Sequence, residues 1–285
     1  MAAQLSSIED IQTFTNTREQ KLRRWCLADV NISPNYEDVA KSLQKNHNIA
    51  VHGYDQVGHG RSEGARAIIH DFQHYVDDAI QFVDIIKSEY PDVPVFVMGH
   101  SMGGLVLGHL LIRESELCDG AIMYAAAVHV NTDIVSAFKR SISRCTGIVL
   151  PFFPVKRVDD NLLTRNAEEV KRLKNDPLRY QGSIKARWVS NCIKAAMEFN
   201  EQMSEITVPM FIAHGDDDKV CHIEGSTKLE KTVSSKDKIF MVYGGCYHRL
   251  HTEPDGYGER FIDDVGNGSL AIVETVFNNS SASLC

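Results

Sequence analysis

The sequence lacks the features that mark disulfide-stapled secreted domains and nucleic-acid-binding proteins. Its 285 residues include 7 cysteines, an odd number with no CxxC pair, so neither a disulfide framework nor a zinc ribbon is expected. There is no basic tract, and 30 Lys and Arg against 38 Asp and Glu give a formal net charge of −8. Because phosphate backbones are bound by clustered positive charge, we expect no nucleic-acid partner.

Long hydrophobic runs are missing as well. No stretch approaches the roughly 18 apolar residues of a membrane span, and the richest, IVLPFFPV at 148–155, is far shorter. This segment either packs into the core of an inserted cap or forms an exposed lip that faces a membrane. The first residues have neither the basic nor the apolar region of a secretory signal. We therefore expect a cytoplasmic protein, soluble or peripheral on a membrane surface, with reduced cysteines.

The rest of the composition is that of an ordinary globular protein, with 43% hydrophobic and 24% charged residues. Short apolar segments alternate with segments of helical periodicity. The expected strands are 49–54, 93–98, 120–128, 208–213 and 238–242, and the expected helices are 72–90, 103–113, 224–233 and 257–277. Such alternation predicts a mostly parallel sheet with helices on both faces, which is the α/β fold class.

The alternation breaks at about 131–205, where polar helical stretches occur without a convincing strand. A strandless insertion of this kind predicts a helical cap. The expected organisation is a single domain, residues 1–285, with its core at about 1–130 and 206–285 and the cap between them.

A G-x-S-x-G motif at 99–103 is the strongest chemical signal. It follows an apolar strand and opens a helix, which is the setting of a nucleophile elbow, a turn too tight for side chains at its glycines. The turn would hold the Ser101 hydroxyl at the carboxyl end of the sheet and aim the Met102 N–H at an oxyanion. The alternative, a glycine-rich turn with an incidental serine, does not account for strand, turn and helix together.

A serine nucleophile needs a base, and the base needs an acid to orient it. In this type of fold the chain order is Ser, then Asp or Glu, then His. His248 is the best base, because it lies in a glycine-rich loop directly after the last strand, whereas His251 either contacts substrate or is merely exposed. The acid is one of the adjacent aspartates at 216–218, after the strand 208–213, and chemistry alone leaves the choice among them open.

Several motifs together resemble the monoglyceride lipase family, in the serine aminopeptidase branch of the α/β hydrolases. They are DQVGHGRSEG at 55–64, GHSMGG at 99–104, NDPL at 175–178 and YHRLHTE at 247–253, and the similarity runs from about 36 to about 277. The resemblance implies an α/β-hydrolase fold and an ester-cleaving serine hydrolase that uses no cofactor or metal.

The resemblance also implies roles for particular residues. In the family the acid is the last residue of G-x-x-D, which here is Asp218. His251 matches a position that helps to bind the glycerol end of the substrate. The cap would present an apolar rim to membranes or micelles and enclose a tunnel for the acyl chain.

One part of the family pattern is absent. The family has a central strand that ends in an H-G-x-G-E-type loop before the helix that here begins near Tyr36, but 25–36 has no apolar run long enough for both. We therefore expect the central strand to be missing. Either 21–30 shifts inward to fill the slot, or the chain is a spliced or mis-assembled version of a complete enzyme. Loss of one oxyanion donor costs about 10²- to 10³-fold in kcat, so we hypothesise a weak or inactive hydrolase.

Two weak cofactor motifs and two cysteines near the site were also considered, and none of them implies a cofactor. His70 and His74 have the i, i+4 spacing of zinc ligands but lack the Glu of H-E-x-x-H. The glycines at 58–64 fit a dinucleotide loop poorly. Cys221 and Cys246 lie near the expected acid and base, either as small buried hydrophobes or as thiols whose alkylation blocks the site.

The sequence therefore predicts a hydrolase that cleaves a monoacylglycerol, or a similar acyl ester, to a fatty acid and glycerol. Ser101, His248 and Asp218 are the predicted catalytic residues. A lysophospholipase or general carboxylesterase is an alternative, because the triad does not determine the leaving group. From another class, an inactive hydrolase kept as a lipid- or partner-binding module remains open. The oligomeric state cannot be read from the sequence.

Overall fold

The computed structural model describes residues 12–13, 23–28, 36–129 and 152–282. Within these ranges one sheet of seven strands has the order β1-β3-β2-β4-β5-β8-β9. β1 pairs antiparallel with β3, and every other neighbouring pair is parallel. The strands are β1 Gln12–Thr13, β2 Arg23–Ala28, β3 Ile49–Gly53, β4 Val95–His100, β5 Gly120–Tyr124, β8 Met210–Gly215 and β9 Lys238–Tyr243.

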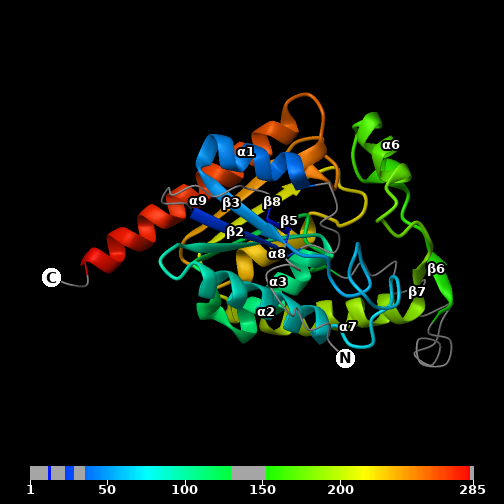
Figure 1. Ribbon diagram of the computed structural model, residues 1–285, viewed down its shortest axis with the longest axis horizontal. Helices are drawn as coiled ribbons and strands as arrows, with labels where there is room; N and C mark the ends of the chain where they lie inside the picture. The colour runs from blue at the N-terminus through cyan, green and yellow to red at the C-terminus, as the bar shows by residue number, and fades with distance from the viewer. Residues whose placement is uncertain (1–11, 14–22, 29–35, 130–151, 283–285) are drawn as a thin grey trace.

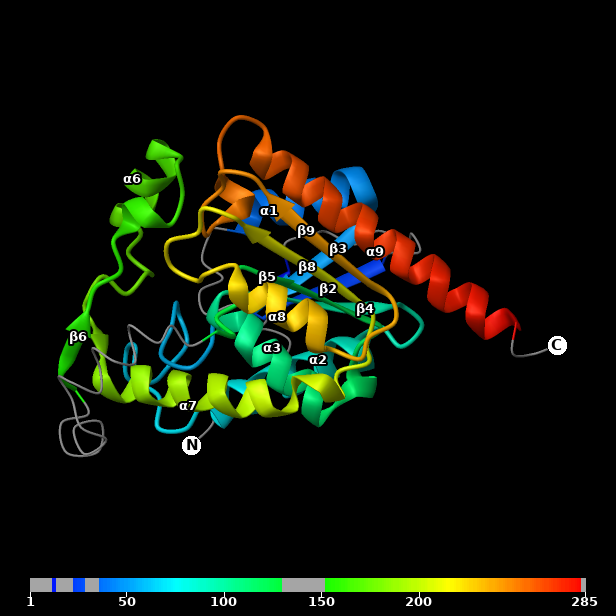
Figure 2. The same cartoon turned by 180° about the vertical axis from the view of Figure 1, so that it is seen from behind.

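Helices cover both faces of the sheet, as expected for the α/β class. Figures 1 and 2 show α1 and α9 on one face and α2, α3 and α8 on the other. These helices are α1 Glu37–His47, α2 Gln73–Glu89, α3 Met102–Arg113, α8 Glu224–Thr232 and α9 Tyr257–Ala282, with short 3₁₀ turns η3 Ser115–Leu117 and η6 Leu250–Thr252. β3, β4, β5 and β8 are buried at every position, because a parallel sheet covered on both sides has no solvent face.

The central strand before Tyr36 is present, so the expectation that it is missing was wrong. β2 lies between β3 and β4 and is parallel to both, with Trp25 opposite Val51 on one side and Phe96 on the other. Of the two outcomes considered, the structure supports the first, because residues 23–28 fill the slot. An empty slot would leave the facing backbone groups of two buried strands unpaired, which is costly. The segment 29–35, where the oxyanion loop is expected, lies outside the described residues.

The insertion between β5 and β8 contains helices and also strands. Its described elements are β6 Pro154–Lys156, η4 Asp160–Leu162, α6 Ala167–Asn175, β7 Ile184–Lys185, α7 Ala186–Gln202 and η5 Met203–Glu205. β6 and β7 form a two-stranded antiparallel sheet, so the expectation of a strandless insertion was wrong. Strands of two or three residues are too short to show an alternating pattern.

Two surfaces of the insertion are well defined. Phe152, Phe153 and Val155 are 65%, 47% and 37% exposed, so this part of the apolar piece is not cap core, while 148–151 lies outside the described residues. On its inner side α7 packs along α3, where a Cβ at Gly108 would lie 2.4 Å from the ring of Phe199. In the part of the chain that the structure describes, no helix has the length and apolarity needed to cross a bilayer.

Candidate active site

Ser101 lies in the turn between β4 and α3, at the carboxyl end of the sheet, with φ 55° and ψ −119°. A positive φ is rare for a residue with a side chain and marks local strain. The turn holds this conformation through the backbone of Ser101: its N–H donates to the Tyr124 carbonyl at 3.2 Å, and its carbonyl accepts from the N–H of Ala127 at 2.9 Å. The strained serine is thus fixed by the residues at and after the end of β5.

The glycines of the motif allow the close approach of β4 and α3. A Cβ at Gly99 would lie 2.5 Å from the Gly103 carbonyl oxygen, closer than real Cβ contacts, so only glycine fits there. Met102 is the first residue of α3, and the first N–H groups of a helix have no partner within it. The Met102 N–H is therefore a helix N-terminal donor directly beside Ser101, which is the position that an oxyanion donor needs. Its catalytic role stays a prediction.

His248 and Asp218 form a buried hydrogen-bonded pair. The His248 Nδ1 lies 2.7 Å from Asp218 Oδ2, and their side chains are 3% and 0% exposed. The other carboxylate oxygen accepts from the N–H groups of Val220 and Cys221 at 2.7 and 2.9 Å. Burial alone would raise the pKa of Asp218, but the charge of His248 and the hydrogen bonds from His214, His248 and Val220 hold it well below its usual range.

The geometry distinguishes between the three adjacent aspartates. Asp216 accepts from the N–H of Gly245 at 2.5 Å, and Asp217 pairs with Lys219. Only Asp218 of the three turns inward to His248. The structure thus brings together the His248 and Asp218 expected from the sequence, and their catalytic roles stay predictions.

His214 is a member of this site that sequence reasoning missed. Its Nε2 lies 2.8 Å from the Cys221 carbonyl oxygen and 3.3 Å from Asp218 Oδ2, and its Nδ1 lies 2.7 Å from Ser226 Oγ. Because a carbonyl only accepts, Nε2 carries a proton. The signal available in the sequence was a histidine next to a glycine at the end of a buried strand, which does not identify its partners.

The residue before the nucleophile connects the two halves of the site. His100 Nε2 lies 3.0 Å from the His248 carbonyl oxygen, and the two rings are 4.6 Å apart. Within the described residues no hydrogen bond joins the Ser101 hydroxyl to His248, whose ring instead contacts Asp218 through Nδ1. Such catalytic hydrogen bonds commonly tighten only in the substrate complex.

Both cysteines near the site are protonated thiols. Burial raises the pKa of Cys221, and it raises the pKa of Cys246 to about 11. Since the thiolate is the reactive form, these are poor nucleophiles at neutral pH. The raised pKa values therefore favour the interpretation that Cys221 and Cys246 are small buried hydrophobic residues over the interpretation that they are reactive thiols.

His251 lies in a buried aromatic cluster under the cap and is 7% exposed, so the alternative of a merely exposed residue is excluded. The ring of Tyr36 stacks on it at 4.8 Å. Its Nδ1 lies 3.1 Å from the Tyr124 hydroxyl, and its Nε2 lies 3.2 Å from Arg249 Nη2. A direct contact between His251 and substrate stays a prediction.

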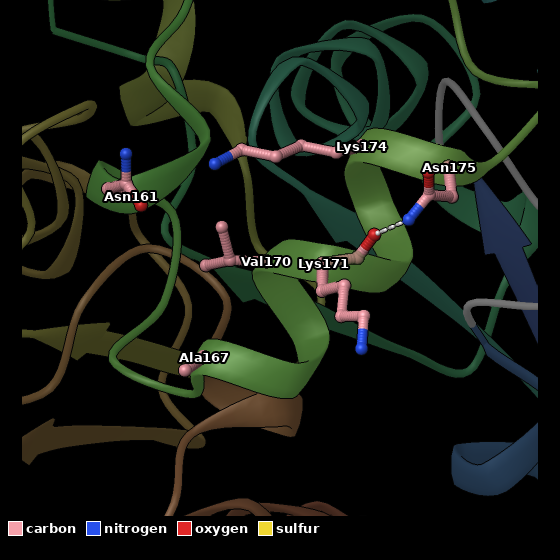
Figure 3. Close-up of a pocket in the computed structure, with 6 residues that line it drawn as sticks. All are labelled: Asn161, Ala167, Val170, Lys171, Lys174 and Asn175. Carbon is pink, nitrogen blue, oxygen red and sulfur yellow. Dashed lines mark hydrogen bonds between the residues drawn. The ribbon is translucent and has the colours of Figure 1, made fainter.

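Two further features were examined for ligand binding. Within the described residues no group of three or more His, Cys, Asp or Glu side chains is arranged to hold a metal ion. A hollow of about 410 Å³ lies against α6 (Figure 3) and contains none of the predicted catalytic residues. Its lining is Asn161, Ala167, Val170, Lys171, Lys174 and Asn175.

Comparison with known proteins confirms the resemblance seen in the motifs. The model of the serine aminopeptidase S33 family matches residues 31–255. The monoglyceride lipase of Mus musculus is 34% identical over 218 residues, which are 76% of this chain and 72% of that protein.

Solved structures share the fold. The monoacylglycerol lipase of Paleococcus ferrophilus superimposes with a TM-score of 0.74 at 24% identity, covering 87% of this chain and 94% of that one. A soluble variant of the Saccharomyces cerevisiae monoglyceride lipase, solved with a substrate analogue, gives a TM-score of 0.79 at 18% identity and covers 90% and 89%. The predicted α/β-hydrolase fold is therefore confirmed.

Proposed function

Because this chain belongs to the serine aminopeptidase S33 family and is, like its monoglyceride lipase relatives, a carboxylic ester hydrolase, we propose that its substrate is a monoacylglycerol. The products would be a free fatty acid and glycerol. The observation that carries the proposal is the buried His248–Asp218 pair, whose nearest atoms are 2.7 Å apart. This pair follows the carboxyl ends of β8 and β9, and the strained Ser101 turn follows the carboxyl end of β4. The names of the relatives supply the substrate class.

The geometry supports a two-step acyl transfer. Ser101 Oγ would attack the ester carbonyl while His248 Nε2 takes its proton, and the Met102 N–H would stabilise the oxyanion. His248 would then donate the proton to the departing glycerol oxygen, leaving an acyl-serine that water cleaves in the same way. Because Asp218 accepts at His248 Nδ1, it would hold Nδ1 protonated and Nε2 free to act as the base.

The test of the substrate is a comparison of leaving groups. We expect kcat/KM for a monoacylglycerol to exceed that for a lysophosphatidylcholine of equal chain length by about 10-fold or more, which is the scale of one lost head-group contact. The measurement is release of free fatty acid below the critical micelle concentration. The reverse order would support the lysophospholipase alternative. Hydrolysis of neither ester would support the inactive binding module and contradict the proposal.

We further propose that the activity is low. Residues 29–35 read DVNISPN and contain no H-G-x-G motif, so the oxyanion would have the Met102 N–H without the second donor of the family pattern. Replacing 29–35 by an H-G-x-G-E-type loop is expected to raise the rate of Ser101 labelling by a fluorophosphonate by about 10²- to 10³-fold. Equal labelling rates in the two proteins would contradict this proposal while leaving the substrate assignment intact.

A further inference from the structure

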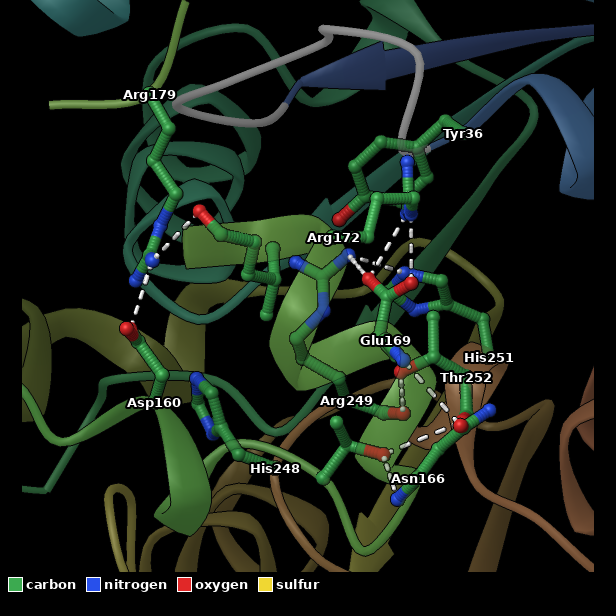
Figure 4. Close-up of polar contacts among 12 residues, drawn as sticks. Tyr36, Asp160, Asn166, Glu169, Arg172, Arg179, His248, Arg249, His251 and Thr252 are labelled. Atoms are coloured by element: carbon green, nitrogen blue, oxygen red, sulfur yellow. Dashed lines mark hydrogen bonds and ion pairs between the residues drawn. The ribbon is translucent and has the colours of Figure 1, made fainter. Parts of the chain in front are cut away.

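The cap contacts the loop that carries His248 through a cluster of charged side chains (Figure 4). Glu169, on α6, lies with Oε1 3.3 Å from Arg249 Nη2. Arg172, one turn along α6, donates from Nε and Nη2 to the two carboxylate oxygens of Glu169 at 2.7 and 2.8 Å. Arg249 directly follows the proposed catalytic base in the chain. Arg249 also contacts His251, so this cluster, Glu169, Arg172 and Arg249, adjoins the histidine that is predicted to bind the glycerol end.

The cluster carries one positive charge in excess, because guanidinium groups stay protonated and one carboxylate faces two of them. The neighbouring Arg165 faces Glu253 at 2.6 Å and the exposed Asp255 at 4.0 Å, so it adds no positive charge to the cluster. Asp218, on the other side of His248, is engaged by donors of its own. Arg249 is only 9% exposed, and its Nε has no hydrogen-bond partner in the described part of the chain. A buried cation with an unsatisfied donor favours the arrival of an anion.

His251 does not supply that anion. A guanidinium only donates, so His251 Nε2 accepts from Arg249 and its proton lies on Nδ1, facing the Tyr124 hydroxyl. Burial, followed by the charge of Arg249, lowers the pKa of His251 well below its usual value, so the ring is neutral. Both ring nitrogens are thus bound to protein groups. Within the described residues, the cationic donors at this end of the site are the guanidinium groups of Arg249 and of Arg172, and the Arg172 side chain is 40% exposed.

We propose that Arg249 and Arg172 form an anion subsite for the head group, and that the preferred substrate is a monoacyl ester with a phosphate monoester beside the scissile bond, such as a monoacylglycerol phosphate. The inference rests on the proposed ester hydrolase function. Water adds across the same acyl C–O bond, and the products are a fatty acid and glycerol phosphate. The cation of a choline head group would face the same excess positive charge, so the phosphate monoester is favoured over a phosphocholine.

The experiment compares 1-octanoylglycerol with 1-octanoylglycerol 3-phosphate. We expect kcat/KM of the intact protein to be about 10- to 100-fold higher for the phosphate ester, the effect of one charge-assisted hydrogen bond. Arg249→Gln is expected to abolish this ratio, chiefly by lowering kcat/KM for the phosphate ester, while Glu169 keeps its two bonds from Arg172. Arg249→Lys should recover part of the ratio, because lysine keeps the positive charge but lacks the planar guanidinium group that can donate two parallel hydrogen bonds.

Arg157→Gln is the matched control. Arg157 is a cap arginine with a 53% exposed side chain that contacts Asp160 and Gln181, and its loss should leave the ratio unchanged. Arg172→Gln should also lower the ratio. Because Arg172 is more exposed than Arg249, this variant serves as the test if Arg249→Gln fails to fold. Absence of any preference for the phosphate ester, or a preference that survives both substitutions, would overturn the proposal.

A binding measurement separates this inference from the proposed function. In Ser101→Ala protein, which cannot form an acyl-enzyme, glycerol 3-phosphate is expected to raise Tm, glycerol at equal concentration is not, and Arg249→Gln should remove the effect. If the protein cleaves no ester but shows this shift, the anion subsite holds and the hydrolase proposal fails. If octanoate raises Tm and glycerol 3-phosphate does not, the subsite binds the product carboxylate and the head-group assignment is wrong.

Discussion

Ser101→Ala is expected to lower ester hydrolysis by about 10⁴- to 10⁶-fold and to abolish labelling by a fluorophosphonate. The substitution removes the only atom that can form the acyl-enzyme in the proposed mechanism, while the turn keeps its backbone hydrogen bonds to Tyr124 and Ala127. The two measurements are fatty-acid release from a monoacylglycerol and gel-based detection of the labelled protein. Both are expected to fall to the level of the uncatalysed reaction plus residual binding effects.

A second serine provides the control for this substitution. Ser88 is an exposed serine near the end of α2 whose hydroxyl donates to the Ile85 carbonyl at 2.8 Å. Ser88→Ala should label and hydrolyse like the intact protein. Persistent labelling of Ser101→Ala, or loss of labelling in Ser88→Ala, would mean that the nucleophile lies elsewhere.

Asp218→Asn is expected to lower kcat by about 10³- to 10⁴-fold with little change in KM. The amide can donate to His248 Nδ1, which stabilises the wrong tautomer and takes the free lone pair away from Nε2. Substitution of its neighbour Asp217, which pairs with the exposed Lys219, is the matched control. Asp217→Asn should keep kcat within about 3-fold, the usual range for a surface change. Similar losses in both variants would show that the loop, rather than the Asp218 carboxylate, is responsible.

The same substitution has a defined pH signature. The pKa of Asp218 is depressed in the folded protein, so its carboxylate contributes stability above the unfolded value of about 3.9 and loses it as pH falls through the folded pKa. The asparagine variant has no such contribution. The difference in free energy of unfolding between the intact protein and Asp218→Asn should therefore stay nearly constant from pH 7 to about 5 and shrink as the pH is lowered further. Urea unfolding at several pH values measures it, and a difference that also stays constant at the lower pH values would contradict the depressed pKa.

The parts of the site that the sequence predicted are those with short-range signals. Ser101 and Met102 could be placed because the glycine spacing admits only a tight strand-to-helix turn. His248 could be placed because it follows the last strand in a glycine-rich loop. Among the aspartates at 216–218, the residues themselves did not identify the inward one. The resemblance to a family selected Asp218, and the structure then brought Asp218 to His248.

The parts that escaped prediction depend on contacts between distant segments. β2 has too few apolar residues to show a strand pattern, and it becomes a strand because two neighbours offer it backbone partners on both sides. The Glu169–Arg249 contact joins residues 80 positions apart, and nothing in either local pattern indicates it. His214 likewise looks like any buried histidine until Asp218 and Ser226 are seen beside it. Local periodicity carries no information on such pairings.

The position of β2 also determines the order in which the sheet can be completed. Its contact with β3 requires only the chain up to residue 53, whereas its contact with β4 requires the chain up to residue 99. A chain that ends between these points therefore contains a pairing partner for only one edge of β2. Since β4 leads directly into the nucleophile turn, the strand that fills the second edge of β2 also carries Ser101 to the middle of the sheet, while Asp218 and His248 follow only after β8 and β9.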